Sequence, residues 1–415
     1  MSYGGDATAV QWGAVPDHVP AEVVIEFDPA RDPAVHARPW EAIEELRARP
    51  LWWSRAKPMA FDGPGYWIPT RAEDLRYVLQ HPDLFSSANP KLAPGNARLI
   101  PLDLDPPEHT KYRQLIASAF SPRSVESIEE ETRTWAFKLI ERFLPDGECE
   151  FLTQFAQPFP TAIFCRIMGI PFERIDEFLE WNRILIHGTD VSERERAVAE
   201  VSAYFAGLIS ERRAEPRDDL VSELARGRID GQPLDVPMLI NISILLFQAG
   251  LDTVTATLGW MLRYLGTHPN ERDRLAADPS LVPNAVEEML RVYAIVSPPR
   301  YATRDCELAG VRIKGGDMLQ ILTVLGSRDP AEFNDAGEVH LDRDRNRHMS
   351  FGLGPHRCVG SHLARAEMTV ALNEILRLMP DIHVPEGAAI RSHAGAVIGL
   401  DRLPLEWTPP SAHGN

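Results

Sequence analysis

The sequence predicts a mainly α-helical fold with a small β portion (α+β). Helical hydrophobic spacing recurs through most of the chain, and one apolar stretch, residues 236–265, is long enough for a central helix. Short strand-like segments fit residues 300–326 and the tail at 384–408. No glycine- and serine-rich linker, low-complexity run or internal repeat divides the 415 residues, so we expect a single domain spanning residues 1–415.

The remaining elements are expected in chain order. Residues 1–40 are rich in proline and acid and should wrap the surface. A helix should begin after Asp105-Pro106-Pro107, because proline is favoured in a first helical turn. Long loops inside compact domains are usually functional, and one is expected at 86–104. We also expect a strand at 65–70 and helices at 72–81, 123–144, 158–169, 172–187, 191–213, 217–227 and 282–293.

Composition excludes several classes of protein. A net charge of −17 argues against nucleic acid as a partner. The four cysteines show no CxxC pair, no zinc spacing and no disulfide framework. The first 28 residues lack a basic-then-apolar signal. Asn241, Gln248 and Asp252 interrupt the long apolar stretch, which favours a core helix over a membrane span. We therefore expect a monomeric, cytoplasmic protein without a membrane anchor.

The most informative segment is Phe-Gly-Leu-Gly-Pro-His-Arg-Cys-Val-Gly at residues 351–360. Cys358 lies in a glycine-rich turn, and a helical pattern begins directly behind it. Little bulk beside the sulfur and the positive end of that helix favour a thiolate over a thiol. A thiolate with open space beside it is a soft, electron-rich metal ligand.

The residues around Cys358 suit a flat haem group. Gly352 and Gly354 would let the backbone pass close to the disc, where a side chain would collide. Gly360 would let backbone amides hydrogen-bond to the sulfur, and Phe351 could shield the sulfur from water. A lone buried cysteine in a turn is the alternative.

The segment resembles the haem-binding loop of the cytochrome P-450 family, Phe-x-x-Gly-x-x-x-Cys-x-Gly, and the resemblance covers nearly the whole chain. It implies the cytochrome P-450 fold, with haem b between the long central helix and the helix behind Cys358. It also implies that the Cys358 thiolate is the axial iron ligand, which favours cleavage of a bound O–O bond. The implied activity is that of a monooxygenase.

The central helix contains Ala249-Gly250-Leu251-Asp252-Thr253. Glycine inside a helix costs about 1 kcal/mol relative to alanine, and a buried aspartate is costly unless paired. A kinked helix with a surface aspartate is the plain interpretation. The segment also resembles the family's acid–alcohol motif, which implies catalytic roles. Gly250 would leave room for O2, Thr253 would donate a proton, and Asp252 would relay protons from solvent.

Two further groups of residues match the family. Glu288 and Arg291 are spaced i, i+3 on a helix; alone they predict an exposed ion pair, whereas the resemblance implies a buried structural network. Haem carries two propionates, which require cations. Each candidate could be an ordinary surface cation or turn histidine, but the resemblance implies that four residues bind the propionates: His109, Arg113, Arg300 and His356.

Three stretches resemble the bacterial camphor hydroxylase subgroup: Leu104–Glu108, Gly250–Val254 and Leu403–Trp407. Two departures argue against camphor itself. Ala97 aligns with the tyrosine that binds the camphor ketone in that relative, and Pro298 stands where the relative has an aspartate.

The candidate pocket residues are mostly aliphatic, as expected for a small apolar guest. We expect a monoterpenoid (a camphor-like ketone or a cyclic ether) or a norisoprenoid. Gln248 could bind an ether or carbonyl oxygen, or could instead be hydrogen-bonded within the core. The pocket residues are Ala97, Leu99, Leu102, Leu245, Gln248, Ala249, Val296, Ala396 and Val397.

No Gly-x-Gly-x-x-Gly dinucleotide site or flavin domain is present, so electrons must come from another protein. The resemblance implies a small [2Fe–2S] ferredoxin and an NADH-dependent ferredoxin reductase. Such ferredoxins are acidic, so a local basic patch is required. We expect it at Arg345, Arg347 and Arg365, joined by Arg113, unless these are only solvated surface charges.

Three other functions remain open at this point. A peroxygenase would use hydrogen peroxide directly, although relatives with that activity depart from the Asp252-Thr253 pair. A haem-based sensor or electron carrier would need no substrate pocket. A thiol hydrolase using Cys358 and His356 would need no haem, and the sequence shows no obvious oxyanion site for it.

Overall fold

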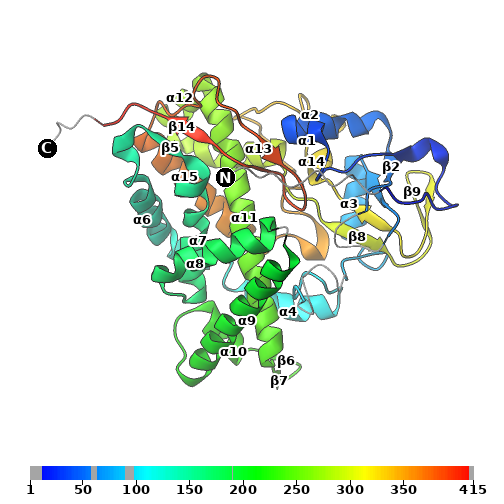
Figure 1. Ribbon diagram of the computed structural model, residues 1–415, viewed down its shortest axis with the longest axis horizontal. Coiled ribbons are helices and arrows are strands. Elements are labelled where there is room, and N and C mark those ends of the chain that lie inside the picture. Colours follow the sequence, from blue (N-terminus) through cyan, green and yellow to red (C-terminus); the bar gives the residue numbers. More distant parts are fainter. Residues whose placement is uncertain (1–11, 58–62, 89–97, 189, 411–415) are drawn as a thin grey trace.

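The computed structural model describes residues 12–57, 63–88, 98–188 and 190–410. Helices fill one side of the molecule, and the main sheet with the N-terminal segment fills the other (Figure 1). The mainly α-helical fold with a small β portion is therefore confirmed. The first twenty residues of the described segment already anchor in the core, because Val19, Val23 and Phe27 are buried.

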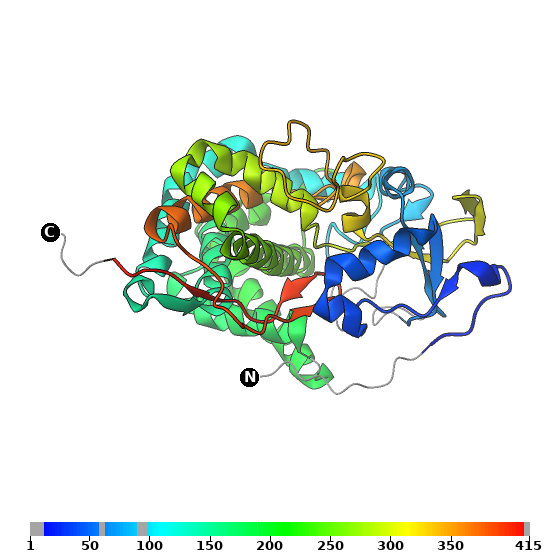
Figure 2. The same ribbon diagram turned by 90° about the horizontal axis from the view of Figure 1, so that it is seen from above.

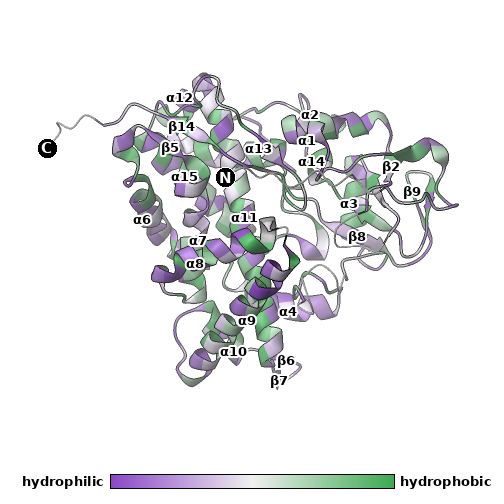
Figure 3. Cartoon of the chain, viewed as in Figure 1, coloured by the Kyte–Doolittle hydropathy of each residue, from purple (hydrophilic) through white to green (hydrophobic). Residues whose placement is uncertain are grey.

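Helix α11 (Val236–Thr267) runs through the centre of the molecule and is seen end-on in Figure 2. Asp235 caps it by accepting a hydrogen bond from the backbone N–H of Met238 at 2.8 Å. Its length and apolar composition alone would suit a membrane span. Other helices surround it in both views, and hydrophobic colour dominates along it in Figure 3, so it is the core helix that the sequence predicts.

The helices around α11 include α15, which packs against α6, α13 and α11 itself. The bounds of these helices are α4 (Glu108–Ala117), α5 (Pro122–Ser127), α6 (Glu129–Ile140), α7 (Pro158–Met168), α8 (Ile175–Asn182), α9 (Val191–Ala214), α10 (Leu220–Arg226), α12 (Pro269–Ala277), α13 (Val282–Val292) and α15 (Ser361–Leu378).

The main sheet has six strands in the order β1-β2-β3-β11-β8-β4. Their bounds are β1 (Val24–Ile25), β2 (Leu51–Ser54), β3 (Tyr66–Pro69), β4 (Phe85–Ser86), β8 (Pro299–Ala302) and β11 (Met318–Gln320). The two-stranded pairs are β5 (Glu148–Glu150) with β14 (Pro404–Glu406), β6 (Arg228–Ile229) with β7 (Gln232–Pro233), β9 (Cys306–Leu308) with β10 (Val311–Ile313), and β12 (Ser392–His393) with β13 (Gly399–Leu400).

Several helices differ from the expectation. The single helix expected at 123–144 is two helices, because the backbone leaves helical geometry at Ile128 (φ −110°, ψ 4°). Three glutamates then open α6, where the positive end of the helix favours acid. Helix α12 was not predicted, because only Leu275 of its residues is buried and the apolar spacing is missing.

The N-terminal segment also forms helices that the sequence did not predict. They are α1 (Pro33–Ala37) and α2 (Pro39–Glu44). The next helix along the chain, α3 (Ala72–Gln80), was predicted. Val35, Trp40 and Ile43 are buried, so this segment packs into the core on one side rather than only wrapping the surface. A fourth short helix, α14 (Thr323–Ser327), follows β11 and is buried throughout.

Two hydrophobic cores meet along α11. One contains α11 residues up to Leu251, together with side chains of α7 to α10. The other contains α11 residues from Val254 onward, together with the main sheet and α15. The boundary between the two cores therefore falls at Asp252 and Thr253, where the site described below is located.

Candidate active site

The cysteine loop between α14 and α15 is held by its own backbone. The N–H of Cys358 donates to the carbonyl of Phe351 at 2.8 Å, and the N–H of Gly352 donates to Met349 at the same distance. Gly352 and Gly354 have left-handed backbones, with φ of 64° and 67°. A Cβ on Gly354 would lie 2.3 Å from the Leu79 carbonyl of α3, so this glycine allows close packing on α3 rather than room for a cofactor.

The Cys358 side chain is exposed, yet enough protein surrounds its sulfur that burial raises the pKa of the thiol. The Gly360 backbone hydrogen-bonds the sulfur, and Arg113, Arg357 and Arg365 lower its pKa without reversing the shift. With no metal bound, these groups leave the pKa of the thiol above its ordinary value, and a bound metal cation would stabilise the thiolate.

The other cysteines are poorer ligands. Burial raises the pKa of the Cys149 and Cys165 thiols to about 12, and that of Cys306 is also raised. Among the described residues, only Cys358 of these four cysteines receives a backbone hydrogen bond at its sulfur.

The middle of α11 also has an open surface. Ala249 and Gly250 are exposed although the helix around them is buried, and a Cβ on Gly250 would meet nothing within 4 Å. The Thr253 hydroxyl donates to the carbonyl of Ala249 at 3.0 Å, and Asp252 is 9% exposed. Because Val359 packs against one core and Phe351 against the other, Cys358 lies at the same boundary as Asp252 and Thr253.

The four predicted propionate ligands come together in space. The rings of His109 on α4 and His356 lie 4.2 Å apart, and Arg113 and Arg300 act electrostatically on both. Among the described residues, Asp105 is the one carboxyl that acts on these groups, and it already accepts hydrogen bonds from Ser86 and from the Ser87 N–H.

Burial and the neighbouring positive charges lower the pKa values in this cluster, and Asp105 only partly offsets them. Burial, then Arg113, lowers the pKa of His109 to about 4. Burial, then Arg300, lowers the pKa of His356 to about 2. Burial lowers the pKa of Arg300 to about 10, although Asp105 opposes this. One buried ring nitrogen on each histidine has no partner in the described part of the chain. Two arginines and two unsatisfied histidines fit a group with two carboxylates, such as haem.

The pair Glu288 and Arg291 is completely buried at 2.8 Å, as the resemblance implied, and not exposed. Arg291 also donates to three backbone carbonyls, which fixes the loop before the cysteine. Sequence reasoning missed a third member, Arg343, whose guanidinium lies 2.9 Å from Glu288. No local spacing could reveal it, since 55 residues separate the two.

A second network holds the cysteine loop from outside. Arg365 donates to both carboxylate oxygens of Glu287, and its guanidinium lies 4.4 Å from the Phe351 ring centre. His348 lies 3.3 Å from the same carboxylate. Arg365 was expected as a free surface cation, but its charge is already paired here. Arg345 and Arg347 are exposed and form no ion pair within the described residues.

The candidate pocket residues lie on three segments. Leu245, Gln248 and Ala249 share one face of α11; the first is buried, the second half-buried and the third exposed. Val296 and Val397 face each other in an antiparallel bridge, and the Ser297 N–H donates to Ala396 at 3.1 Å. Leu99 is buried and Leu102 is 36% exposed. Ala97 lies outside the described residues.

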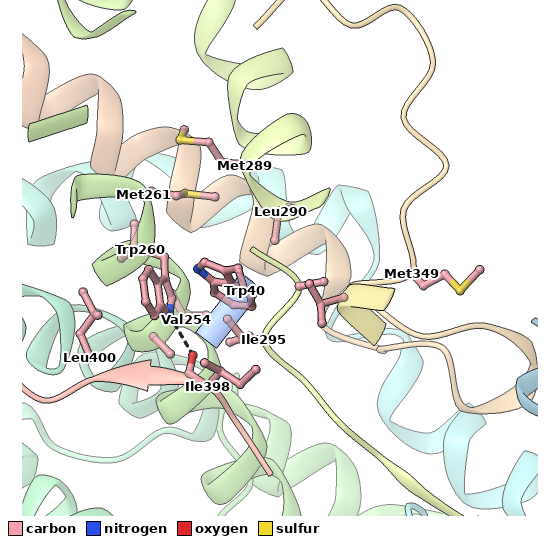
Figure 4. Close-up of a cluster of buried hydrophobic side chains, with 14 of the residues drawn as sticks. Trp40, Val254, Trp260, Met261, Met289, Leu290, Ile295, Met349, Ile398 and Leu400 are labelled. Atoms are coloured by element: carbon pink, nitrogen blue, oxygen red, sulfur yellow. Dashed lines mark hydrogen bonds between the residues drawn. The ribbon is translucent and has the colours of Figure 1, made fainter. Parts of the chain in front are cut away.

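The bridged segments lie against α11 just beyond Thr253. Trp260 of α11 donates its indole N–H to the carbonyl of Ile398 at 3.0 Å, and Figure 4 shows Ile398 and Ile295 beside Val254. Three of the predicted pocket residues, Val296, Ala396 and Val397, are therefore attached to the helix that carries the acid–alcohol pair.

A fold with a cysteine loop on one side of a central helix, and a cation cluster beside both, defines a haem-thiolate protein. The sequence model of the family described as Cytochrome P450 matches residues 161–379. A probable cytochrome P450 127A1 from Sinorhizobium fredii is 33% identical over 408 residues, covering 96% of this chain and 98% of its own length. The chain belongs to the cytochrome P450 family.

Solved structures agree with this assignment. Those of CYP101J2 and CYP101C1 match with a TM-score of 0.87 each, at 34% and 32% identity, over 95% of this chain and 100% of theirs. Mycinamicin IV hydroxylase/epoxidase from Micromonospora griseorubida is 33% identical and covers 85% of this chain and 92% of its own. The protein is thus a monooxygenase of the bacterial type that uses haem b with an axial cysteine thiolate, and the thiol hydrolase interpretation is wrong.

Proposed function

We propose that this monooxygenase hydroxylates a small apolar substrate, a monoterpenoid or norisoprenoid, in the cytoplasm. It would use O2 and electrons from a [2Fe–2S] ferredoxin and an NADH-dependent ferredoxin reductase. Family likeness does not select the substrate, since relatives of 30% to 33% identity are named for mycinamicin IV, methyl-branched lipids and vitamin D3. The argument therefore rests on the site.

The observation that carries the proposal is the bridged pair Val296 and Val397, whose segment is hydrogen-bonded to α11 through Ile398, together with the exposed Ala249 and Gly250 on the same helix. These side chains are short and apolar, and Leu245 extends the same surface along the helix. A wall of this kind excludes water from the reacting carbon and favours a compact hydrocarbon guest. Half-buried Gln248 can donate a hydrogen bond to an ether or carbonyl oxygen, which would orient the guest.

Each site residue has a separate role in this proposal. Cys358 would bind the iron, and His109, Arg113, Arg300 and His356 would bind the propionates. When bound, haem supplies the binding and reductive activation of O2. Thr253 would hold a hydroxyl beside the open face of Gly250 and donate a proton there. Asp252 would resupply that proton from solvent.

A panel of ligands tests the substrate class. Haem-loaded protein is titrated with monoterpenoid ketones, cyclic ethers, norisoprenoids, fatty acids and macrolides, and the low-spin to high-spin change is measured. We expect saturable changes with the terpenoids only. A response to fatty acids or macrolides without any terpenoid response would contradict the proposal.

A pocket variant links that response to the wall. Val397→Phe should weaken terpenoid binding about tenfold or more, because the added ring occupies the guest's space. Val191→Phe is the control, since Val191 is 67% exposed at the start of α9 and far along the chain from the wall. Equal binding by the Val397 variant and the control would remove Val397 from the pocket.

A further inference from the structure

A cavity of about 60 Å³ lies where α2, the C-terminal part of α11 and the pair β12–β13 meet. Three arginines line it: Arg38 precedes α2, Arg263 is on α11, and Arg391 precedes β12. Glu41 is the one acidic residue in the lining, so the lining has an excess of two positive charges. In a chain with a net charge of −17, such a local excess of arginine needs an explanation.

These arginines have no neutralising partner in the part of the chain that the structure describes. Within the described residues no ion pair reaches Arg38, Arg263 or Arg391. Nearby Arg328 shows the usual alternative, since it lies 3.0 Å from the carboxylate of Glu44. The cavity therefore keeps its positive charge for something outside the chain.

Two buried hydrogen-bond donors at the cavity also lack an acceptor among the described residues. They are Nε1 of Trp40 and Nε of Arg263. Trp40 is only 5% exposed, and its ring lies edge-on against Trp260 with the ring centres 4.9 Å apart. The Arg263 guanidinium lies 5.3 Å from the same Trp260 ring. Figure 4 shows Trp40 and Trp260 side by side, with Leu400 close to Trp260.

Native proteins rarely leave buried donors unpaired, and here two occur around one tryptophan at a positively charged cavity. The missing partner must accept several hydrogen bonds and carry negative charge. A single water needs about 10–15 Å³, so the cavity has room for a small polyatomic ion but not for a nucleotide.

We propose that this cavity binds a phosphate group. A phosphate offers acceptor oxygens in several directions, which suits guanidinium donors and an indole N–H that approach from different elements. Arg38, Glu41 and Arg391 are exposed at the rim, so the group can be free phosphate or the phosphate end of a small metabolite. Binding would join the N-terminal segment, the central helix and the C-terminal strands, and would stabilise the haem-loaded fold.

Calorimetric titration of the haem-loaded protein with inorganic phosphate tests this, with chloride holding ionic strength constant. We expect saturable binding to the unchanged protein and a higher midpoint of thermal unfolding. Arg263→Gln and Arg391→Gln should each raise the Kd about tenfold or more, because each removes a charge-assisted hydrogen bond. Trp40→Phe keeps the ring but removes the donor, and should raise the Kd about threefold. Arg123→Gln, at an exposed arginine of α5, is the control and should change nothing.

Titration with glycerol 3-phosphate separates the two sources of the group. Tighter binding of inorganic phosphate supports a site for the free ion, and equal or tighter binding of glycerol 3-phosphate supports a site for a metabolite's phosphate end. Absence of saturable binding of either probe, or an unchanged Kd in the Arg391 and Trp40 variants, overturns the proposal and leaves the cavity to ordered water. Arg391 is exposed, so its variant remains informative if Arg263→Gln does not fold.

Discussion

At the scale of single residues, three positions on α11 combine features that a core helix would avoid. Gly250 leaves open space, and Asp252 is a nearly buried acid. The Thr253 hydroxyl donates a hydrogen bond to the carbonyl of Ala249, one turn back. The Thr253 O–H group can rotate, so it can donate to a guest in the open space instead of to the Ala249 carbonyl. The site thus has a hydroxyl proton, on Thr253, that can be redirected toward the open space at Gly250.

Thr253→Ala tests this role. The variant should consume reductant at a rate close to that of the unchanged enzyme, but the product formed per reductant should fall about tenfold, with peroxide released instead. Product, peroxide and reductant are measured together. Thr255→Ala is the matched control, because the Thr255 hydroxyl donates to the carbonyls of Leu251 and Ala156 and takes no part in the site. Unchanged coupling in the Thr253 variant would remove this residue from proton delivery.

At the scale of elements, a buried charge network joins α13 to the loop that precedes the cysteine. Glu288 binds Arg291 on its own helix, Arg343 and the Asn346 side chain, and it accepts the backbone N–H of His340. Burial alone would raise the pKa of Glu288, but these hydrogen bonds outweigh burial and lower it. The carboxylate is therefore stable only while its partners are present.

Arg291→Met should be strongly destabilising, because it leaves the Glu288 charge buried with fewer partners. We expect a loss of about 3–5 kcal/mol in the free energy of unfolding, measured by denaturant titration of haem-loaded protein. Arg377→Met is the control, since Arg377 forms an i, i+3 pair with Glu374 but is 57% exposed, and should cost less than about 1 kcal/mol. Similar losses in the two variants would show that burial of the Glu288 pair does not determine its importance.

The neighbouring Glu287 network predicts a dependence on pH. Burial raises the pKa of Glu287, but hydrogen bonds from His348 and Arg365 outweigh it and lower the pKa to about 2. A carboxyl whose pKa is lower in the folded state contributes stability that is fully present above its unfolded pKa, about 4.5, and is lost as pH falls toward 2. Between those pH values, the stability of the unchanged protein should fall by about 3 kcal/mol more than that of Glu287→Gln. Parallel curves for the two proteins, measured by circular dichroism, would contradict this assignment.

At the scale of the whole molecule, local patterns predicted much of the fold, and tertiary contacts account for what was missed. The core helix at 236–265 and the cysteine loop were predicted because their signals lie within one segment. Arg343 and the pairing of Arg365 with Glu287 could not be predicted, because their partners lie 55 and 78 residues away. The polar helix α12 was missed because helical spacing is visible only where a helix buries an apolar face.

The net charge of the whole molecule affects how the protein can bind a ferredoxin. A protein of net charge −17 repels an acidic ferredoxin unless a local basic surface offsets the repulsion. Arg365 is paired with Glu287. The stronger candidates are therefore Arg345 and Arg347, which are exposed and form no ion pair with any residue that the structure describes. The double change to glutamate should raise the KM for ferredoxin about tenfold or more, and should leave the spin-state titration with substrate unchanged. High salt should reduce the difference between the variant and the unchanged protein, because exposed charges are screened.

Arg196→Glu changes a 73% exposed arginine on α9 and serves as the control. An equal effect of the control, or an equal effect on substrate binding, would place the ferredoxin surface elsewhere.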